Sequence, residues 1–198
     1  MLHPDTRLQS EALTIRRDVP LVLCDVDEVV VHFLTAFEKF LAGHDLWLDT
    51  SSFALNGNIK QSKNQEPVGE AEVARLITEF FAARTRHLEA IPGAIAALDD
   101  IADHATLVML TNLPGAFRQD RIENLMGHGL HHPVVVNSGP KGPAVELLAD
   151  GHQAPVIFID DSPSYLTSAH AHYPRGRFIH FLQDQRLSPH VAPLDFIS

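Results

Sequence analysis

Two short apolar segments of this chain run directly into aspartates, and this pattern constrains the fold more than any other feature. The first segment, Leu21–Cys24, is followed by Asp25 and Asp27, and the second, Val156–Ile159, is followed by the pair Asp160-Asp161. Continuous apolar runs of this length are typical of strands buried on both faces of a parallel sheet. In such sheets, ligand sites lie beyond the carboxyl ends of the strands. If the two strands are neighbours, their carboxylates converge on one small volume.

Crowded carboxylates determine what else must be present at that place. They repel one another, so that some must take up a proton or a cation must lie among them. A cluster made only of acidic oxygens suits a hard cation, and Mg²⁺ is the natural choice. The pattern therefore predicts a magnesium site and indicates an enzyme.

Composition narrows the class of partner. The chain has 198 residues, which fits one domain with a small insertion. Lysine and arginine number 15 against 25 aspartates and glutamates, a net charge of −10 with histidine neutral. This balance argues against a nucleic-acid polymer or an anionic membrane as the main partner. A small anionic substrate stays possible, because a metal and a few cations can reverse the local field.

Localisation is predicted from what the sequence lacks. Its apolar runs are far shorter than the roughly 18–20 residues of a membrane span. The first residues, 1–5, are polar and lack the apolar region of a signal peptide. Cys24 is the only cysteine, so that no internal disulfide can form. We expect a cytoplasmic protein.

The order of predicted elements gives the fold class. After about residue 90, apolar strands alternate with helical segments up to a last strand at 178–182. Such alternation is typical of right-handed βαβ units. We predict an α/β fold, a Rossmann-like three-layer parallel sheet with a small inserted helical cap. The expected division is a core of 19–30 and 90–198, a cap of 31–89 and a lead-in of 1–18.

Inside the predicted cap we expect two helices separated by a long loop. One helix begins near Val30 and carries an aromatic stripe, and a second carries the apolar side chains of 73–81. Residues 50–69 are rich in Ser, Asn, Gln, Lys and Gly, and are interpreted as a polar loop. Loops of this length are usually functional or disordered. Four of its side chains are candidates to face the substrate: Asn56, Asn58, Lys60 and Lys63.

Polar groups also follow the later strands. The strand at 107–110 ends in Thr111-Asn112, and Lys141 follows the strand at 133–136. Hydroxyl groups and backbone N–H groups before a helix are suited to phosphate. Arg118 and Arg121, in the helical segment after Thr111, are interpreted as solvated side chains, with contact to a distal anion as the alternative for Arg118.

The ordered set of these residues resembles the four motifs of the haloacid dehalogenase-like (HAD) hydrolase superfamily. The motifs are Asp25-Val26-Asp27-Glu28-Val29, Thr111-Asn112, Lys141 and Asp160-Asp161, and the resemblance spans about residues 20–182. Most members of that family transfer phosphoryl groups through an aspartyl-phosphate with Mg²⁺ bound, and true dehalogenases lack the second aspartate. Because this chain has Asp27, the resemblance implies a phosphatase.

The resemblance implies a role for each residue. Asp25 is the expected nucleophile, and Asp27 the general acid and base. Thr111 and the backbone N–H of Asn112 are expected to hold phosphate oxygens, and Lys141 to offset their charge. The list of expected metal ligands is Asp25, the backbone carbonyl of Asp27, Asp160, and Asp161 either directly or through water.

Two points are left open by the sequence. The family usually has a small residue after the second aspartate, whereas this chain has Glu28, which puts rate and substrate range in question. The sequence of residues 27–33 resembles that of 5′(3′)-deoxyribonucleotidase-type members, so a nucleotidase is the first alternative. The second alternative is a catalytically weak protein that binds a phosphorylated ligand or a protein partner.

Overall fold

The fold is built on one parallel sheet. The structure is a computed structural model and describes residues 2–197. The sheet has the order β5-β4-β1-β6-β7, and every pairing in it is parallel. Its strands are β1 (Leu21–Cys24), β4 (Thr106–Asn112), β5 (Val134–Asn137), β6 (Val156–Asp160) and β7 (Arg177–His180).

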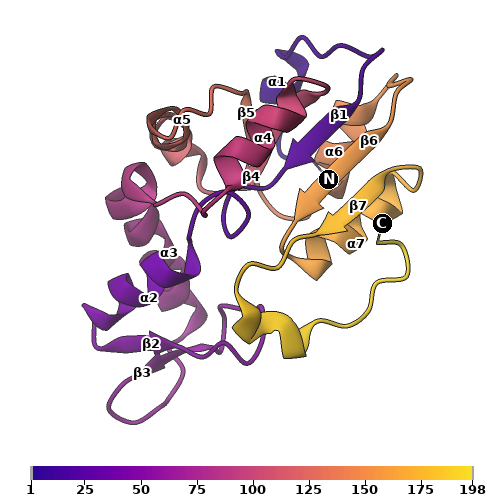
Figure 1. Cartoon of the computed structure of the whole chain (residues 1–198). Coiled ribbons are helices and arrows are strands. Elements are labelled where there is room, and N and C mark those ends of the chain that lie inside the picture. The colour runs from indigo at the N-terminus through magenta and orange to yellow at the C-terminus, as the bar shows by residue number, and fades with distance from the viewer. Residues whose placement is uncertain (1, 198) are drawn as a thin grey trace.

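Helices cover both faces of the sheet, which gives three layers (Figure 1). Alternate strand residues belong to two separate apolar clusters, as expected when side chains alternate between faces. One face packs against α4 (Ala94–Ala102) and α5 (Arg118–Gly127). The other packs against α6 (Gly142–Ala149) and α7 (Pro163–His172). The predicted α/β fold with a three-layer parallel sheet is confirmed.

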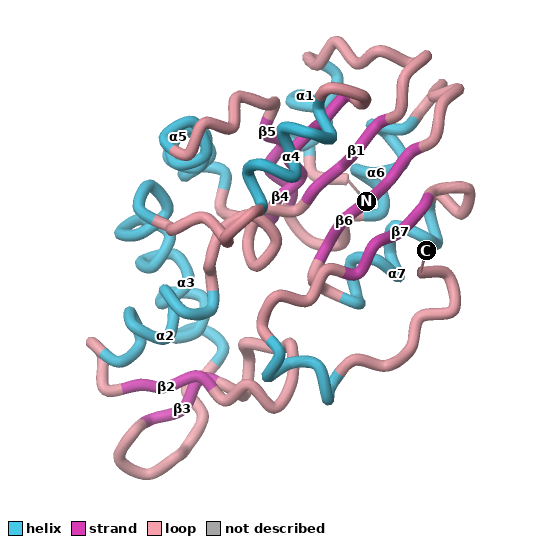
Figure 2. The backbone as a smooth tube through the Cα atoms, in the orientation of Figure 1, coloured by secondary structure: helices cyan, strands magenta, loops and turns pink. Residues whose placement is uncertain are grey.

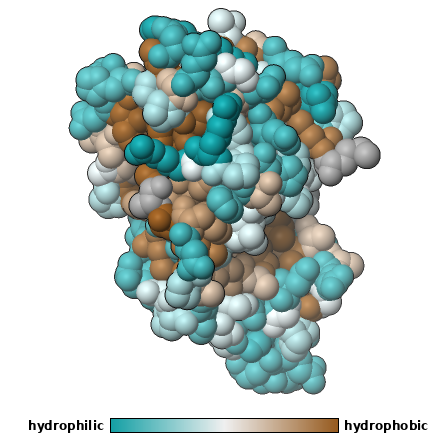
Figure 3. Space-filling view, turned by 90° about the vertical axis from the view of Figure 1, so that its right-hand side faces the viewer, coloured by the Kyte–Doolittle hydropathy of each residue, from teal (hydrophilic) through white to brown (hydrophobic). Residues whose placement is uncertain are grey.

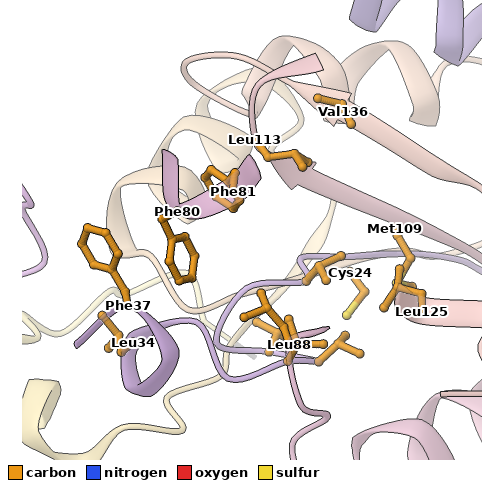
Figure 4. Packing of buried hydrophobic residues seen from close by; sticks show 14 of the residues in the cluster. Cys24, Leu34, Phe37, Phe80, Phe81, Leu88, Met109, Leu113, Leu125 and Val136 are labelled. Carbon is orange, nitrogen blue, oxygen red and sulfur yellow. The ribbon is translucent and has the colours of Figure 1, made fainter. Parts of the chain in front are cut away.

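Residues 31–89, hereafter the inserted segment, lie between β1 and β4. Its elements are α2 (Leu34–Ala42), β2 (Leu46–Leu48), β3 (Ile59–Gln61), α3 (Glu70–Arg84) and the short 3-10 helix η1 (Thr85–His87). Figure 4 shows Phe37 of α2 beside Phe80 of α3, with ring centroids 5.1 Å apart. These aromatic side chains belong to the same apolar cluster as Cys24 and Met109 of the sheet. The inserted segment and one face of the sheet therefore share a core.

The expected boundaries change at two places in the inserted segment. The first helix begins at Leu34 and not near Val30, because residues 26–31 form a tight turn in which the N–H groups of Val29, Val30 and Val31 donate to the Val26 carbonyl. The polar loop of 50–69 contains β3, which pairs antiparallel with β2 (Figure 2). This strand has only three residues, Ile59-Lys60-Gln61, and two of them are polar, so the sequence does not indicate a strand without its partner.

Two further elements were not expected. The lead-in contains α1 (Pro4–Glu11), whose Thr6 hydroxyl donates to the Val136 carbonyl of β5 over 2.9 Å. After β7, a short 3-10 helix η3 (Gln185–His190) carries Leu187 into the shared apolar cluster. No helix within residues 2–197 has the length and apolar character needed to span a bilayer.

Candidate active site

The site lies where the topology changes direction. From β1 the chain passes to β4 and β5 on one side, and later to β6 and β7 on the other. Clefts at the carboxyl ends of strands open at this kind of switch point. In the register of the sheet, Cys24 pairs with Ile159, so that Asp25 and Asp160 follow at the same level. The two aspartate-bearing strands are neighbours, which is the condition on which the expected cluster of carboxylates depends.

Three carboxylates meet at this edge. Asp25, Asp160 and Asp161 each offer an oxygen, and these oxygens all lie within 4.8 Å of one another. Asp160 is fully buried, and its Oδ1 accepts the Ser162 N–H over 2.8 Å. Burial raises the pKa of Asp161 well above its ordinary value, and the charges of Asp160 and Asp25 raise it further. A divalent cation would relieve this repulsion, and an all-carboxylate donor set fits Mg²⁺.

Lys141 ties two of these carboxylates together. It precedes α6, and its Nζ lies 2.7 Å from Asp25 Oδ1 and 2.7 Å from Asp160 Oδ2. Burial alone lowers the pKa of Lys141, but the charges of Asp160 and Asp25 outweigh burial and raise it. The amine also lies 4.9 Å from the centre of the Tyr165 ring. Lys141 is thus a fixed positive charge beneath Asp25.

Asp27 has a partner that the sequence did not reveal. Its Oδ1 accepts from Nη2 of Arg121 on α5 over 2.6 Å. The interpretation of Arg121 as a solvated side chain is wrong, because the residue is fully buried. Arg118 is half-buried and donates to the Val134 carbonyl. Burial raises the pKa of Asp27, and the charge of Arg121 opposes that rise.

The phosphate-binding candidates lie at the end of β4. Thr111 is fully buried, and its hydroxyl has no hydrogen-bond partner within residues 2–197. The Asn112 side chain donates to the Gly139 carbonyl and to the Tyr165 hydroxyl, each over 2.9 Å. Because buried polar groups are normally paired, the unpaired Thr111 hydroxyl is unusual.

A cavity of about 640 Å³ opens beside the carboxylates. Asp25, Asp27, Asn112 and Asp161 line its sheet side. Its remaining lining residues are Glu28, Phe33, Leu34, Leu48, Thr50, Ser52, Phe53, Ala54, Leu55, Ile77, Phe81, Ser162, Ser164, Tyr165 and Leu187. The loop of 50–69 therefore does face the site, but through residues 50–55.

The four loop side chains named from the sequence lie elsewhere. Asn58 donates to the Ser52 hydroxyl and the Ala54 carbonyl, and thus holds the loop together. Lys60 forms an ion pair with Asp49 over 2.6 Å. Asn56 and Lys63 are exposed, and neither lines the cavity. The candidates chosen from the sequence to face the substrate were polar, whereas the loop places the apolar side chains of Phe53 and Leu55 in the cavity wall.

Comparison with solved structures identifies the architecture. The sequence matches no family model and no curated protein. A haloacid dehalogenase-like family hydrolase from Streptococcus pneumoniae, SP0104, superposes with a TM-score of 0.59 over 90% of this chain and 93% of that chain, at 14% identity. The HAD-hydrolase YfnB from Bacillus subtilis, bound to magnesium, gives 0.53 over 82% and 86%, at 12% identity.

A phosphoglycolate phosphatase-like protein from Lactobacillus plantarum gives a TM-score of 0.55 over 81% of this chain and 85% of that chain, at 14% identity. The chain has the haloacid dehalogenase-like fold. Identities this low establish the fold alone. Within this fold, the aspartates after β1 and β6 lie at the carboxyl ends of neighbouring strands, at the switch point of the sheet.

Proposed function

We propose that this chain is a Mg²⁺-dependent phosphomonoesterase that works through an aspartyl-phosphate on Asp25. The observation that carries this proposal is the position of Asp25 at the floor of the cavity. Its Oδ1 is held by the Val26 N–H and by Lys141, each over 2.7 Å. No described residue donates to Oδ2, so this oxygen is available to a phosphorus atom. A nucleophile fixed in this way is suited to covalent catalysis.

In the first step, an Asp25 oxygen forms a bond to phosphorus while the bond from phosphorus to the leaving oxygen breaks. Asp27 gives its proton to that leaving oxygen, and the raised pKa of Asp27 is consistent with a role as acid. In the second step, Asp27 takes a proton from water, the water oxygen attacks phosphorus, and Asp25 is released. Bound Mg²⁺ would supply positive charge to the phosphoryl oxygens.

The remaining residues stabilise charge. The unpaired Thr111 hydroxyl is suited to donate to a phosphoryl oxygen, together with the backbone N–H of Asn112. Lys141 offsets negative charge on Asp25 and on the phosphoryl group. For the metal we propose the carboxylates of Asp25, Asp160 and Asp161 and the backbone carbonyl of Asp27.

We also propose that residues 31–89 act as a cap over a core of 19–30 and 90–198. Phe53, Leu55 and Phe81 of the inserted segment line the same cavity as Asp25. This position suits a cover that excludes water from an acyl phosphate. A location in the cytoplasm stays a prediction.

The test is hydrolysis of p-nitrophenyl phosphate by the purified chain, with Mg²⁺ and with EDTA. We expect turnover that needs Mg²⁺ and falls about a thousandfold or more in Asp25→Asn. Asp100→Asn, which changes an exposed aspartate of α4, is the matched control and should keep full activity. Turnover that survives Asp25→Asn would contradict the aspartyl-phosphate.

A screen of nucleoside monophosphates in the same assay addresses the nucleotidase alternative. Binding of phosphorylated compounds without turnover of any would instead favour the catalytically weak binding protein.

A further inference from the structure

We infer that the substrate is a phosphate monoester whose leaving group is uncharged and largely apolar. This inference rests on the proposed function and concerns the part of the cavity beyond the phosphoryl group. There the wall is built from four separate parts of the chain, which contribute Phe33 and Leu34, Leu48 and Phe53–Leu55, Ile77 and Phe81, and Leu187. Figure 3 shows a hollow with hydrophobic surface between the two lobes of the molecule. An apolar wall of this kind favours an apolar ligand surface.

The aromatic part of this wall is rigidly supported. The Phe33 ring lies 5.8 Å from that of Phe81 and 5.2 Å from that of Phe80, which is itself fully buried. Phe81 is 4% exposed and Phe33 is half-buried, so only their cavity-facing parts remain open. Aromatic surface fixed before binding gives contact area at little cost in side-chain entropy.

Charge is the stronger constraint on the leaving group. Every charged side chain that lines the cavity is acidic, namely Asp25, Asp27, Glu28 and Asp161. Within residues 2–197, no lysine, arginine or histidine lines it. Mg²⁺ and Lys141 would balance one phosphoryl group. A second anion on the leaving group would find no lysine, arginine or histidine side chain in the cavity lining within residues 2–197 to balance it, which is unfavourable beside the acidic groups.

The nearest buried cations do not change this conclusion. Lys141 is fully buried beneath Asp25 and Asp160, and Arg121 is fully buried behind Asp27. Neutral polar groups of the cavity are the hydroxyls of Thr50, Ser52, Ser162, Ser164 and Tyr165 and the amide of Asn112. These groups can bind a few hydroxyl or amide substituents but cannot neutralise a carboxylate. Phosphoglycolate, with its carboxylate, is therefore a poor fit to this site.

A matched pair of substrates tests the inference. Benzyl phosphate and 4-carboxybenzyl phosphate have similar leaving alcohols and differ in one remote carboxylate. We expect kcat/KM with Mg²⁺ to favour benzyl phosphate by about 50-fold or more. Phosphoglycolate should be at least as poor as the carboxylated ester. Equal or better turnover of 4-carboxybenzyl phosphate would overturn the inference.

A charge introduced into the wall gives a second readout. Phe53 is half-buried in the wall of the cavity, and Phe53→Arg supplies the missing cation. This variant should raise turnover of 4-carboxybenzyl phosphate relative to benzyl phosphate by about 10-fold or more. Phe53→Gln, a polar change without charge, and Leu8→Arg, at a residue that is 66% exposed on α1, should leave the ratio near that of the unchanged chain. If Phe53→Arg leaves the ratio unchanged, the acidic lining does not set specificity.

Binding separates this inference from the proposed function. Benzylphosphonate and 4-carboxybenzylphosphonate cannot be hydrolysed, and calorimetry with Mg²⁺ measures their affinities whether or not the chain is an enzyme. If benzylphosphonate binds more tightly than 4-carboxybenzylphosphonate but no phosphate ester is hydrolysed, the proposed function is contradicted and the inferred preference for an uncharged group is supported. Equal affinity for the two phosphonates, or no binding of either, would overturn the inference.

Discussion

At the scale of single residues, the structure gives a local role to Glu28, which stands where the HAD-like family usually has a small residue. Its φ is 60°, in the left-handed region where a side chain costs about 1 kcal/mol or more. A glycine, which has no Cβ, would avoid that cost. In return, Glu28 Oε1 accepts the N–H of Leu34, the first residue of α2, over 2.6 Å. Phe33, at the N-cap, makes no side-chain cap bond, so Glu28 caps the helix from six residues earlier.

Burial gives Glu28 a measurable pH signature. It raises the pKa of Glu28 from 4.5 to about 7, although the Leu34 N–H opposes the rise. Between these two pH values the folded chain holds a proton that the unfolded chain has released. The folded state therefore loses stability as pH rises through this window, and the loss is complete above about pH 7.

Glu28→Gln should remove this pH dependence, since the amide oxygen can still accept the Leu34 N–H. The free energy of unfolding of the variant should equal that of the unchanged chain near pH 4.5 and should be about 2 kcal/mol larger at pH 8. Urea unfolding in EDTA at several pH values measures the difference. Glu146→Gln, at an exposed position of α6, is the control and should show no such trend. If the difference in the free energy of unfolding between Glu28→Gln and the unchanged chain is the same at every pH, the pKa of Glu28 is not raised.

At the scale of elements, α5 buries a polar face. Asn124 donates to the Leu88 carbonyl over 2.8 Å, and Arg121 pairs with Asp27, so that α5 contacts both the end of the inserted segment and the turn after β1. Nε and Nη1 of Arg121 have no partner among the described residues. The helix therefore positions Asp27 at a cost in unsatisfied donors.

Arg121→Leu should leave the Asp27 carboxylate partly buried without its partner. We expect a loss of about 2–4 kcal/mol in the free energy of unfolding and a fall in kcat, because Asp27 is no longer oriented. Arg84→Leu, at an exposed arginine of α3, is the matched control. In Asp27→Asn the stability cost of Arg121→Leu should shrink. If the losses in the free energy of unfolding from Arg121→Leu and Asp27→Asn simply add in the double variant, Arg121 and Asp27 are not coupled.

At the scale of the whole molecule, the segment after β7 connects the core to the inserted segment (Figure 1). Nη1 of Arg186 on η3 pairs with Glu38 on α2 over 2.7 Å. Leu187 is 5% exposed, lies in the shared apolar cluster and lines the cavity. Since the ion pair is half exposed, most of the stabilisation comes from Leu187.

Leu187→Ala should lower the free energy of unfolding by about 2 kcal/mol, from lost burial and the space that remains. It should also raise KM, because one wall of the cavity is removed. Leu8→Ala, at a leucine that is 66% exposed, should change stability by less than about 0.5 kcal/mol. Chemical denaturation and steady-state kinetics on both variants give the answer. A KM unchanged in a destabilised Leu187→Ala would mean that η3 does not shape the substrate site.

The strands and their acidic ends could be predicted from the sequence. A run such as Leu21–Cys24 is apolar at every position only when both faces of its strand are covered, and Asp25 can then only lie at the strand end. The fold class follows from these local patterns and from the right-handed connections of parallel strands. The meeting of Asp25 with Asp160 and Asp161 also requires β1 and β6 to be neighbours, which the structure shows.

The partners across the sheet were decided only by tertiary structure. Nothing near Arg121 in the sequence marks it as buried, because its partner Asp27 lies 94 positions away. The same holds for β3, which needs β2 beside it, and for Phe53, which faces the cavity while Lys60 turns to Asp49. Local sequence determines which elements form. Which charges are paired, and which side chains face the substrate, depends on distant groups that only the folded chain brings within bonding distance.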